Sequence, residues 1–110
     1  MALRNFEPFT EDATRYVVRQ ILTALAFLHK NHIIHGDIKL ENVVLQAKIG
    51  GCVAKLADFG ISEPISSTQE SNRIVGTQGY IAPEILKCEG YGTASDIWSL
   101  GCLIYAMLTA

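Results

Sequence analysis

Apolar residues recur at helical spacing in the first third of the chain. One face of this segment carries five of them, Tyr16, Val17, Ile21, Leu25 and Leu28. Thr10 can cap such a helix because its side-chain oxygen can accept a backbone N–H. Two acidic residues follow Thr10, where the helix dipole favours negative charge. The pattern therefore predicts an amphipathic helix that begins after Thr10 and ends at about Lys30.

The pattern changes after residue 42. Two short β-branched runs, 43–45 and 53–57, flank a glycine-containing turn at 48–52 and predict a small β-hairpin. Residues 60–79 are rich in Ser, Thr and Gly and show no periodicity, which predicts a long loop of the kind that usually carries function. Residues 83–87 could form one or two helical turns. Together with the first helix, these elements predict an α+β fold that is mainly helical.

The last stretch of the chain is the most apolar. Ser95 is the predicted cap of a final helix, with Asp96 in its first turn. That helix is too short to span a bilayer and apolar enough to be buried on every side. It ends without a capping signal, so we interpret it as a helix that is cut within a buried core. We therefore expect an exposed apolar patch, and aggregation or partner binding by the isolated chain.

Composition limits the function classes. With 110 residues, of which 49% are hydrophobic and 18% charged, the chain reads as one globular domain. A net charge of −2 gives no electrostatic case for binding nucleic acid or an anionic membrane. Cys52, Cys88 and Cys102 are scattered, which argues against a disulfide framework or a zinc site. The absence of a signal peptide adds an expectation of an intracellular protein, cytoplasmic or nuclear.

Residues 35–42 place an acid, a base and an amide within one short loop. Asp37 could orient or deprotonate a hydroxyl, and Lys39 could neutralise phosphate charge. Asn42 could ligate a hard cation through its oxygen. A solvated surface loop is the alternative interpretation of this motif when it is considered alone.

Three further motifs follow in order. Asp58, Phe59 and Gly60 come directly after the predicted returning strand, where a carboxylate can reach a metal while the backbone turns sharply. Residues 76–84 and 95–101 combine turn residues with residues that begin helices. Each motif alone is also compatible with an ordinary turn. An unrelated metal-binding α/β domain would require all four motifs to be coincidental.

The order and spacing of the four motifs resemble the signature set of protein kinases: H-R-D-L-x-x-x-N, then D-F-G, then A-P-E. The resemblance implies a fragment of the kinase large lobe in which residues 58–84 form a long activation segment. Residues 1–110 would be a partial kinase domain, without the N-terminal ATP-gripping lobe and the C-terminal helices. Lys39 and the spacing from Gly76 to Tyr80 are similar to the serine/threonine class.

The resemblance assigns chemical roles to five residues. Asp37 would accept or steer the proton of the substrate hydroxyl. Asn42 and Asp58 would hold two Mg²⁺ ions, and Lys39 would contact the γ-phosphate of ATP. Thr77 is similar to the threonine that packs on the catalytic aspartate and lysine and positions substrate.

The resemblance also assigns supporting roles. Val44 is similar to the residue beneath the adenine ring, and Ala57 could line the same pocket, although plain core packing explains both residues equally well. His35 and Phe59 are similar to two members of a stacked hydrophobic column.

The resemblance also covers positions that support the loop 35–42 and positions where this chain departs from the family. Asp96 resembles the helix aspartate that holds the backbone of the catalytic loop, and Glu84 resembles the glutamate whose arginine partner would lie beyond residue 110. Gly36 stands where the family has arginine, and Leu40 where it usually has proline. In the family, that arginine commonly pairs with a phosphate on the activation segment. Because glycine replaces it here, four hydroxyl residues are only weak candidates for a phosphorylation switch: Ser66, Ser67, Thr68 and Ser71.

Two functional interpretations remain open. The intact parent protein would transfer the γ-phosphate of ATP to Ser or Thr of a protein substrate. Alternatively, the chain is a truncated, catalytically inactive kinase fragment that acts at most as a binding module. The sequence holds no glycine-rich phosphate loop, so we expect negligible turnover by these 110 residues alone. The oligomeric state is left open.

Overall fold

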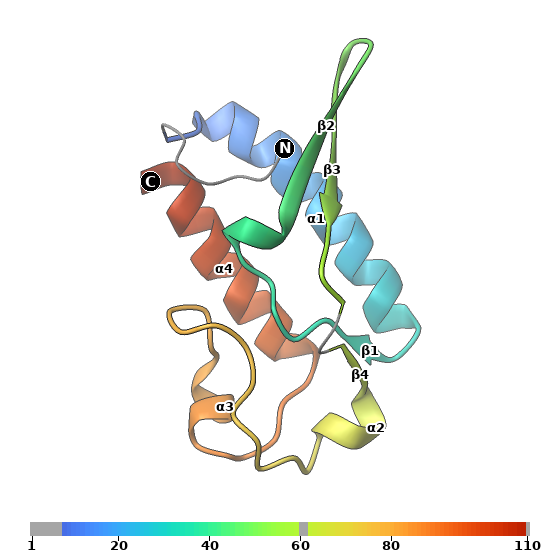
Figure 1. Cartoon of the computed structure of the whole chain (residues 1–110), viewed down its shortest axis with the longest axis vertical. Coiled ribbons are helices and arrows are strands. Elements are labelled where there is room, and N and C mark those ends of the chain that lie inside the picture. Colours follow the sequence, from blue (N-terminus) through green and yellow to red (C-terminus); the bar gives the residue numbers. More distant parts are fainter. Residues whose placement is uncertain (1–7, 60–61, 110) are drawn as a thin grey trace.

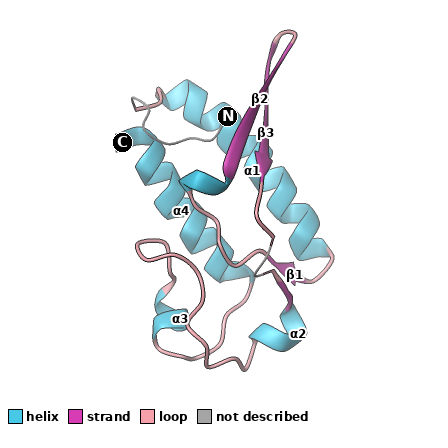
Figure 2. Cartoon of the chain, viewed as in Figure 1, coloured by secondary structure: helices cyan, strands magenta, loops and turns pink. Residues whose placement is uncertain are grey.

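Two long helices and a β-hairpin form the body of the molecule. The computed structural model describes residues 8–59 and 62–109. Helix α1 (Glu11–Lys30) lies beside helix α4 (Thr93–Thr109), and the hairpin of β2 (Val43–Lys48) and β3 (Gly51–Leu56) packs on α1 (Figure 1). Helices dominate the remaining elements as well (Figure 2), which makes the fold mainly helical α+β.

Helix α1 confirms the prediction from hydrophobic periodicity. The side-chain oxygen of Thr10 caps it by accepting the N–H of Ala13 at 3.1 Å. Its buried face consists of Thr14, Val17, Ile21 and Leu25. Tyr16 is half-exposed instead, and its hydroxyl donates to the carbonyl of Cys52 on β3 at 3.1 Å.

Helix α4 runs antiparallel to α1. At one end the N–H of Phe9 donates to the carbonyl of Met107 at 2.8 Å, and at the other His29 contacts Asp96. The helix begins at Thr93, which puts its cap position at residue 92, so the prediction that Ser95 caps it was wrong by three residues. Ser95 lies in the first turn, where its hydroxyl oxygen accepts the N–H of Gly92 at 3.2 Å.

One apolar core joins the two helices, the hairpin and the loop between them. Its buried members are Val17, Ile21, Leu25, Ile38, Val43, Ala54, Leu100, Leu103 and Met107. Burial of this set is the main source of stability for the fold, because apolar area removed from water contributes about 25 cal/mol per Å². The core also anchors the loop 35–42, because Ile38, in the middle of that loop, is fully buried in it.

The two strands of the hairpin extend further toward the turn than predicted, and the second strand ends at Leu56, before the predicted end at residue 57. Its strands pair antiparallel from Val43 opposite Leu56 to Lys48 opposite Gly51. Gln20 of α1 holds the second strand with both ends of its amide. Its Nε2 donates to the carbonyl of Cys52 at 3.4 Å, and its Oε1 accepts the N–H of Ala54 at 2.9 Å.

Short elements fill the other end of the molecule. Strand β1 (Ile33–Ile34) pairs antiparallel with β4 (Glu63–Pro64), which leads into α2 (Ile65–Thr68). Helix α3 (Pro83–Leu86) forms the turn predicted for 83–87. The prediction of a structureless loop over 60–79 was therefore wrong at β4 and α2. A second small core underlies these elements and contains Ile34, Ala82, Ile85 and Tyr91.

Helix α4 is not buried on every side. Ile97, Trp98 and Tyr105 are 49%, 50% and 71% exposed. With Tyr80 they line a groove of about 520 Å³ along the helix. The expected exposed apolar patch is thus present. Among the described residues, no helix combines the length and the apolar character that crossing a membrane requires.

Candidate functional site

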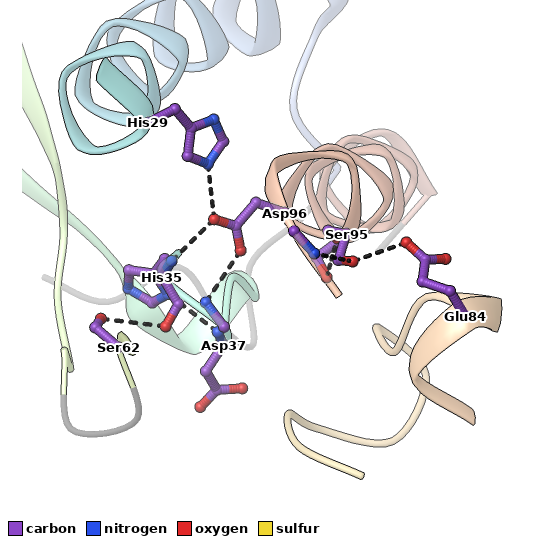
Figure 3. Close-up of polar contacts among 10 residues, drawn as sticks. His29, His35, Asp37, Ser62, Glu84, Ser95 and Asp96 are labelled. Carbon is purple, nitrogen blue, oxygen red and sulfur yellow. Dashed lines mark hydrogen bonds and ion pairs between the residues drawn. The ribbon is translucent and has the colours of Figure 1, made fainter. Parts of the chain in front are cut away.

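The carboxylate of Asp96 holds the backbone of the loop 35–42. Its two oxygens accept the N–H groups of His35 at 2.9 Å and Gly36 at 3.0 Å (Figure 3). The Asp96 side chain is only 2% exposed. Gly36 has φ of +88°, in the left-handed region that glycine adopts without a steric penalty. A buried anion on α4 therefore fixes the chain just before Asp37.

A third donor completes the surroundings of Asp96. The Nε2 atom of His29, at the end of α1, lies 2.9 Å from Asp96 Oδ2 and donates to it (Figure 3). A buried carboxylate is tolerated when hydrogen bonds replace its water shell, and three donors do so here. The sequence pattern does not reveal this role of His29, because a basic residue in the last turn of a helix is already explained by the helix dipole.

The ring of His35 links the loop to the end of β3. Its Nδ1 accepts the N–H of Asp37 at 3.1 Å, and its Nε2 lies 3.1 Å from the carbonyl of Ala57. Nδ1 must accept and Nε2 must donate, so the ring carries its proton on Nε2. The N–H of Ala57 in turn donates to the carbonyl of Asn42 at 2.8 Å.

These contacts place Asp58 at the rim of the loop. The residue before it, Ala57, bonds to His35 and Asn42, and the ring of Phe59 after it packs edge-on against His35 with centroids 4.9 Å apart. Asp58 is exposed and has φ of +57°, a sharp turn for a non-glycine residue. Gly60, the third residue of this motif, lies outside the described residues.

Asp37, Lys39 and Thr77 form a closed triangle of polar contacts. The hydroxyl of Thr77 donates to Asp37 Oδ1 at 2.7 Å and accepts from Lys39 Nζ at 2.8 Å. Lys39 Nζ also lies 3.6 Å from Asp37 Oδ2. The side chains of Asp37 and Lys39 are 14% and 20% exposed, so both remain within reach of a ligand.

Asn42 lies in the 3₁₀ turn η1 (Leu40–Asn42) and contacts one member of this triangle, Asp37. Its Nδ2 donates to the backbone carbonyl of Asp37 at 2.7 Å and lies 3.5 Å from Asp37 Oδ2. The amide nitrogen is committed to these contacts, so the amide oxygen is the atom that could ligate a cation.

Thr77 reaches the loop because the segment around it is anchored at two points. A Cβ at Gly76 would lie 3.2 Å from the carbonyl oxygen of Gly36, so the two backbones approach closely there. The hydroxyl of Tyr80 accepts the N–H of Leu40 at 3.4 Å, and the carbonyl of Tyr80 accepts the hydroxyl of Ser99 at 2.7 Å. Neither Ser99 nor the Tyr80 hydroxyl is among the residues predicted from the sequence to support the site.

Two predicted residues lie away from the triangle. Glu84, expected to lack its family partner, accepts the hydroxyl of Ser95 at 2.7 Å (Figure 3). Val44 is half-buried next to the fully buried Val43. Successive strand residues point to opposite faces, so Val44 faces away from the core that contains Val43.

The donor set suits a hard cation. Asp37, Asp58 and Asn42 offer carboxylate and amide oxygens, which are typical ligands of Mg²⁺. No group of three or more His, Cys, Asp or Glu that could hold a metal occurs among the described residues. Mg²⁺ does not need such a group, because it commonly uses one or two carboxylates and completes its shell with water and phosphate oxygens.

Comparison with known proteins gives consistent matches. The family model described as "Protein kinase domain" matches residues 1–110. The chain is 43% identical over 109 residues to "Mitogen-activated protein kinase kinase kinase A" of Dictyostelium discoideum, which covers 98% of this chain and 11% of that relative. It is 40% identical over 106 residues to "Probable serine/threonine-protein kinase 2" of Plasmodium falciparum (isolate K1 / Thailand), which covers 96% and 21%.

A third relative is "Calcium/calmodulin-dependent protein kinase type II" of Caenorhabditis elegans, 37% identical over 102 residues, with 93% of this chain and 14% of that relative covered. The chain therefore spans about one tenth to one fifth of the length of these three relatives.

Proposed function

Because the chain belongs to the protein kinase domain family, we propose that the protein containing it transfers the γ-phosphate of ATP to serine or threonine hydroxyls of protein substrates. The observation that carries the proposal is the hydroxyl of Thr77, which bridges Asp37 Oδ1 and Lys39 Nζ. This bridge sets an acceptor of protons beside a cation. In-line phosphoryl transfer requires both, since a hydroxyl must be aimed and phosphate charge must be offset.

Asp37 would steer the substrate hydroxyl and accept its proton on a carboxylate oxygen. The hydroxyl of Thr77 donates to Asp37 Oδ1, and the amide of Asn42 holds the backbone carbonyl of Asp37 and lies 3.5 Å from Oδ2, so both residues orient the carboxylate before the reaction. Lys39 is held at 2.8 Å by the same Thr77 hydroxyl and would contact a phosphate oxygen. Asn42 and Asp58 would hold Mg²⁺, which supplies the neutralising charge for the triphosphate when it is bound.

The rest of an ATP site is proposed to come from segments outside residues 1–110. The share of the relatives that the chain spans supports this interpretation, as does the lack of a glycine-rich phosphate loop in the sequence. In this proposal residues 58–84 act as the activation segment and the chain is a partial kinase domain. An intracellular location, cytoplasmic or nuclear, belongs to the same proposal because ATP is the phosphoryl donor.

The test uses the intact parent protein and transfer of labelled γ-phosphate to a generic Ser/Thr substrate. Asp37→Asn keeps the side-chain shape and removes the proton acceptor, so we expect kcat to fall by about 100-fold or more. Asp12→Asn is the matched control, since Asp12 is 93% exposed on the first turn of α1. Equal kcat for the Asp37 variant and the parent protein would refute the assignment of Asp37.

The groove along α4 favours a second candidate function. An exposed apolar groove of about 520 Å³ is suited to contacts with another protein surface, as a catalytically inactive binding module would need. The isolated chain separates the two candidates. Absence of transfer by the chain, together with Asp37-dependent transfer by the parent, would leave binding as the function of the chain alone.

A further inference from the structure

An ion pair closes the chain between strand β4 and the turn that carries Thr77. The guanidinium of Arg73 bonds to Glu63 Oε1 across ten residues of chain. The other oxygen of the same carboxylate, Glu63 Oε2, accepts the hydroxyl of Ser67 at 3.2 Å. Both oxygens of Glu63 are therefore used, and the ion pair turns residues 63–73 into a closed loop.

Glu63 is attached to the elements that precede Asp37. Its backbone lies in β4, opposite Ile34 of β1. The hydroxyl of the neighbouring Ser62 donates to the carbonyl of His35 at 3.1 Å. Asp37 follows His35 by two positions in the chain, so the anion of the pair is held in a fixed place relative to Asp37.

Arg73 reaches the site from the other side. Three residues separate it from Thr77, and an extended chain spans at most about 3.5 Å per residue. Val75, which lies between them, packs against the second small core, the one that contains Ile34. A cation that is fixed at position 73 therefore limits how far the Thr77 hydroxyl can move from Asp37.

Other contacts of this stretch are few. Residues 71–77 form neither helix nor strand, and Ile74 is 57% exposed. Gly36 stands where the family has arginine, so the loop 35–42 offers no guanidinium to the stretch. Arg73 is the only basic residue between positions 55 and 87 of the sequence, which makes it the one cation that this part of the chain itself supplies.

We propose that the Glu63–Arg73 pair positions Thr77, so that its hydroxyl can bridge Asp37 and Lys39. The inference rests on the function proposed above, because it concerns the same three polar groups. No hydrogen bond or ion pair between described residues joins Glu63 or Arg73 to that triangle, so both are positioning residues that act through Thr77. The role belongs to the pair of opposite charges, and reversal of both charges should preserve it.

The expected effect is modest, because water reaches the pair. The side chains of Arg73 and Glu63 are 58% and 23% exposed. An ion pair of this exposure shifts an equilibrium between closed and open loop by about 2- to 5-fold. Burial and the Glu63 carboxylate raise the pKa of Tyr91, the other titratable group beside the pair, so it stays neutral and does not compete for Arg73.

The first test measures kcat of the intact parent protein with labelled γ-phosphate. Arg73→Gln should lower kcat by about 2- to 5-fold, and Glu63→Arg combined with Arg73→Glu should restore it. In a Thr77→Val background, Arg73→Gln should cause no further loss, because the residue through which it acts has already lost its hydroxyl. Arg15→Gln is the matched control, since Arg15 is 59% exposed and pairs with Asp12 in the first turn of α1.

The second test uses the 110-residue chain and does not depend on catalysis. The N–H of Tyr80 donates to the carbonyl of Thr77 at 2.9 Å, so hydrogen exchange of this amide reports on the turn that presents Thr77. Arg73→Gln should speed the exchange by about 2- to 5-fold, and the charge-reversed double variant should return it to the parent value. Arg15→Gln should leave the exchange rate unchanged.

Together the two tests separate the positioning role from the proposed function. If the parent protein transfers no phosphate, the proposed function fails, and exchange of the Tyr80 amide alone decides the positioning role. That role is overturned if Arg73→Gln leaves the exchange or a measurable kcat unchanged, or if charge reversal does not restore them, including the case in which a variant unfolds. Additive losses of kcat from Arg73→Gln and Thr77→Val would also overturn it, because they would show that the pair does not act through Thr77.

Discussion

Asp96 on α4 accepts the backbone N–H of His35 at 2.9 Å, although 61 positions separate the two residues in the chain. The bond attaches the loop 35–42 to helix α4. His29 and Gly36 donate to the same carboxylate, so α1, the loop and α4 meet at one buried anion. The position of Asp37 relative to the rest of the site depends on this junction.

Asp96→Asn should therefore be strongly destabilising. An amide presents one acceptor and one donor group to three donors, so at least one N–H of the junction is left without a partner. We expect the free energy of unfolding to fall by about 2–4 kcal/mol, measured by urea titration of the circular dichroism signal. Asp12→Asn, which alters a 93% exposed carboxylate, should change it by less than about 0.5 kcal/mol. A shared midpoint for the two variants would contradict this account.

Gly90 offers a test of close backbone approach. Gly90 and Gly50 have the same φ of +84°, so alanine at either position carries the same left-handed strain of about 1 kcal/mol. A Cβ at Gly90 would lie 2.0 Å from the carbonyl oxygen of Gln69, whereas a Cβ at Gly50 would meet no atom within 4 Å. Gly90→Ala should therefore lower the free energy of unfolding by about 1–3 kcal/mol more than Gly50→Ala does. Equal losses in thermal denaturation would show that the backbone of Gln69 relaxes freely.

Local sequence patterns were sufficient to predict the elements that are long enough to repeat their hydrophobic spacing. Val17, Ile21 and Leu25 identify the buried face of α1 because a helix of this length repeats its spacing several times. The hairpin follows from two β-branched runs around glycines, although its strands extend further than the runs themselves. Pairing of Lys48 with Gly51 depends on backbone groups rather than on side chains, so the sequence shows no signal for it.

Contacts between segments that are distant in the chain could not be predicted from local sequence patterns. Strands β1 and β4 have two residues each, too few for an alternating pattern, and they exist because of their mutual pairing. The sequence predicts Ser95 as a cap because serine commonly begins helices, but its hydroxyl donates to Glu84, eleven residues earlier. His29 and the Tyr80 hydroxyl acquire their roles only when the fold brings them to the loop.

Thr77→Val should uncouple Asp37 from Lys39. Valine has nearly the same shape but cannot donate to Asp37 or accept from Lys39, so both charged groups lose a partner at 2.7 and 2.8 Å. We expect a loss of about 1–2 kcal/mol in the free energy of unfolding, with the modest value reflecting partial exposure of both partners. Thr77→Ser keeps the hydroxyl and should recover most of that loss. If serine and valine are equally destabilising, the methyl packing of Thr77 and not its hydroxyl supports the site.

The Glu63–Arg73 pair should give a small acid dependence to stability. The hydrogen bond from Arg73 lowers the pKa of Glu63 below its ordinary value of 4.5. A carboxyl group with a lowered pKa in the folded state contributes stability above its unfolded pKa and loses it as the pH falls through the folded value. Urea midpoints should therefore drop more steeply below about pH 4.5 in the parent chain than in Glu63→Gln. Glu70→Gln, in the same segment but without an ion pair to a described residue, should follow the parent chain. Parallel curves for all three proteins would mean that the pair does not persist in solution.

The exposed face of α4 should make the isolated chain self-associate. Trp98 and Tyr105 are 50% and 71% exposed and share one apolar groove, and burying such a surface between copies removes it from water. Trp98→Gln should shift sedimentation velocity profiles toward the monomer at a given concentration. Ile49→Gln is the matched control, because Ile49 is fully exposed at the tip of the hairpin and lies outside the groove. A parent chain that sediments as a monomer at every concentration, with an unchanged profile in Trp98→Gln, would show that α4 tolerates exposure to water. In that case the groove would offer no driving force for the binding function considered above.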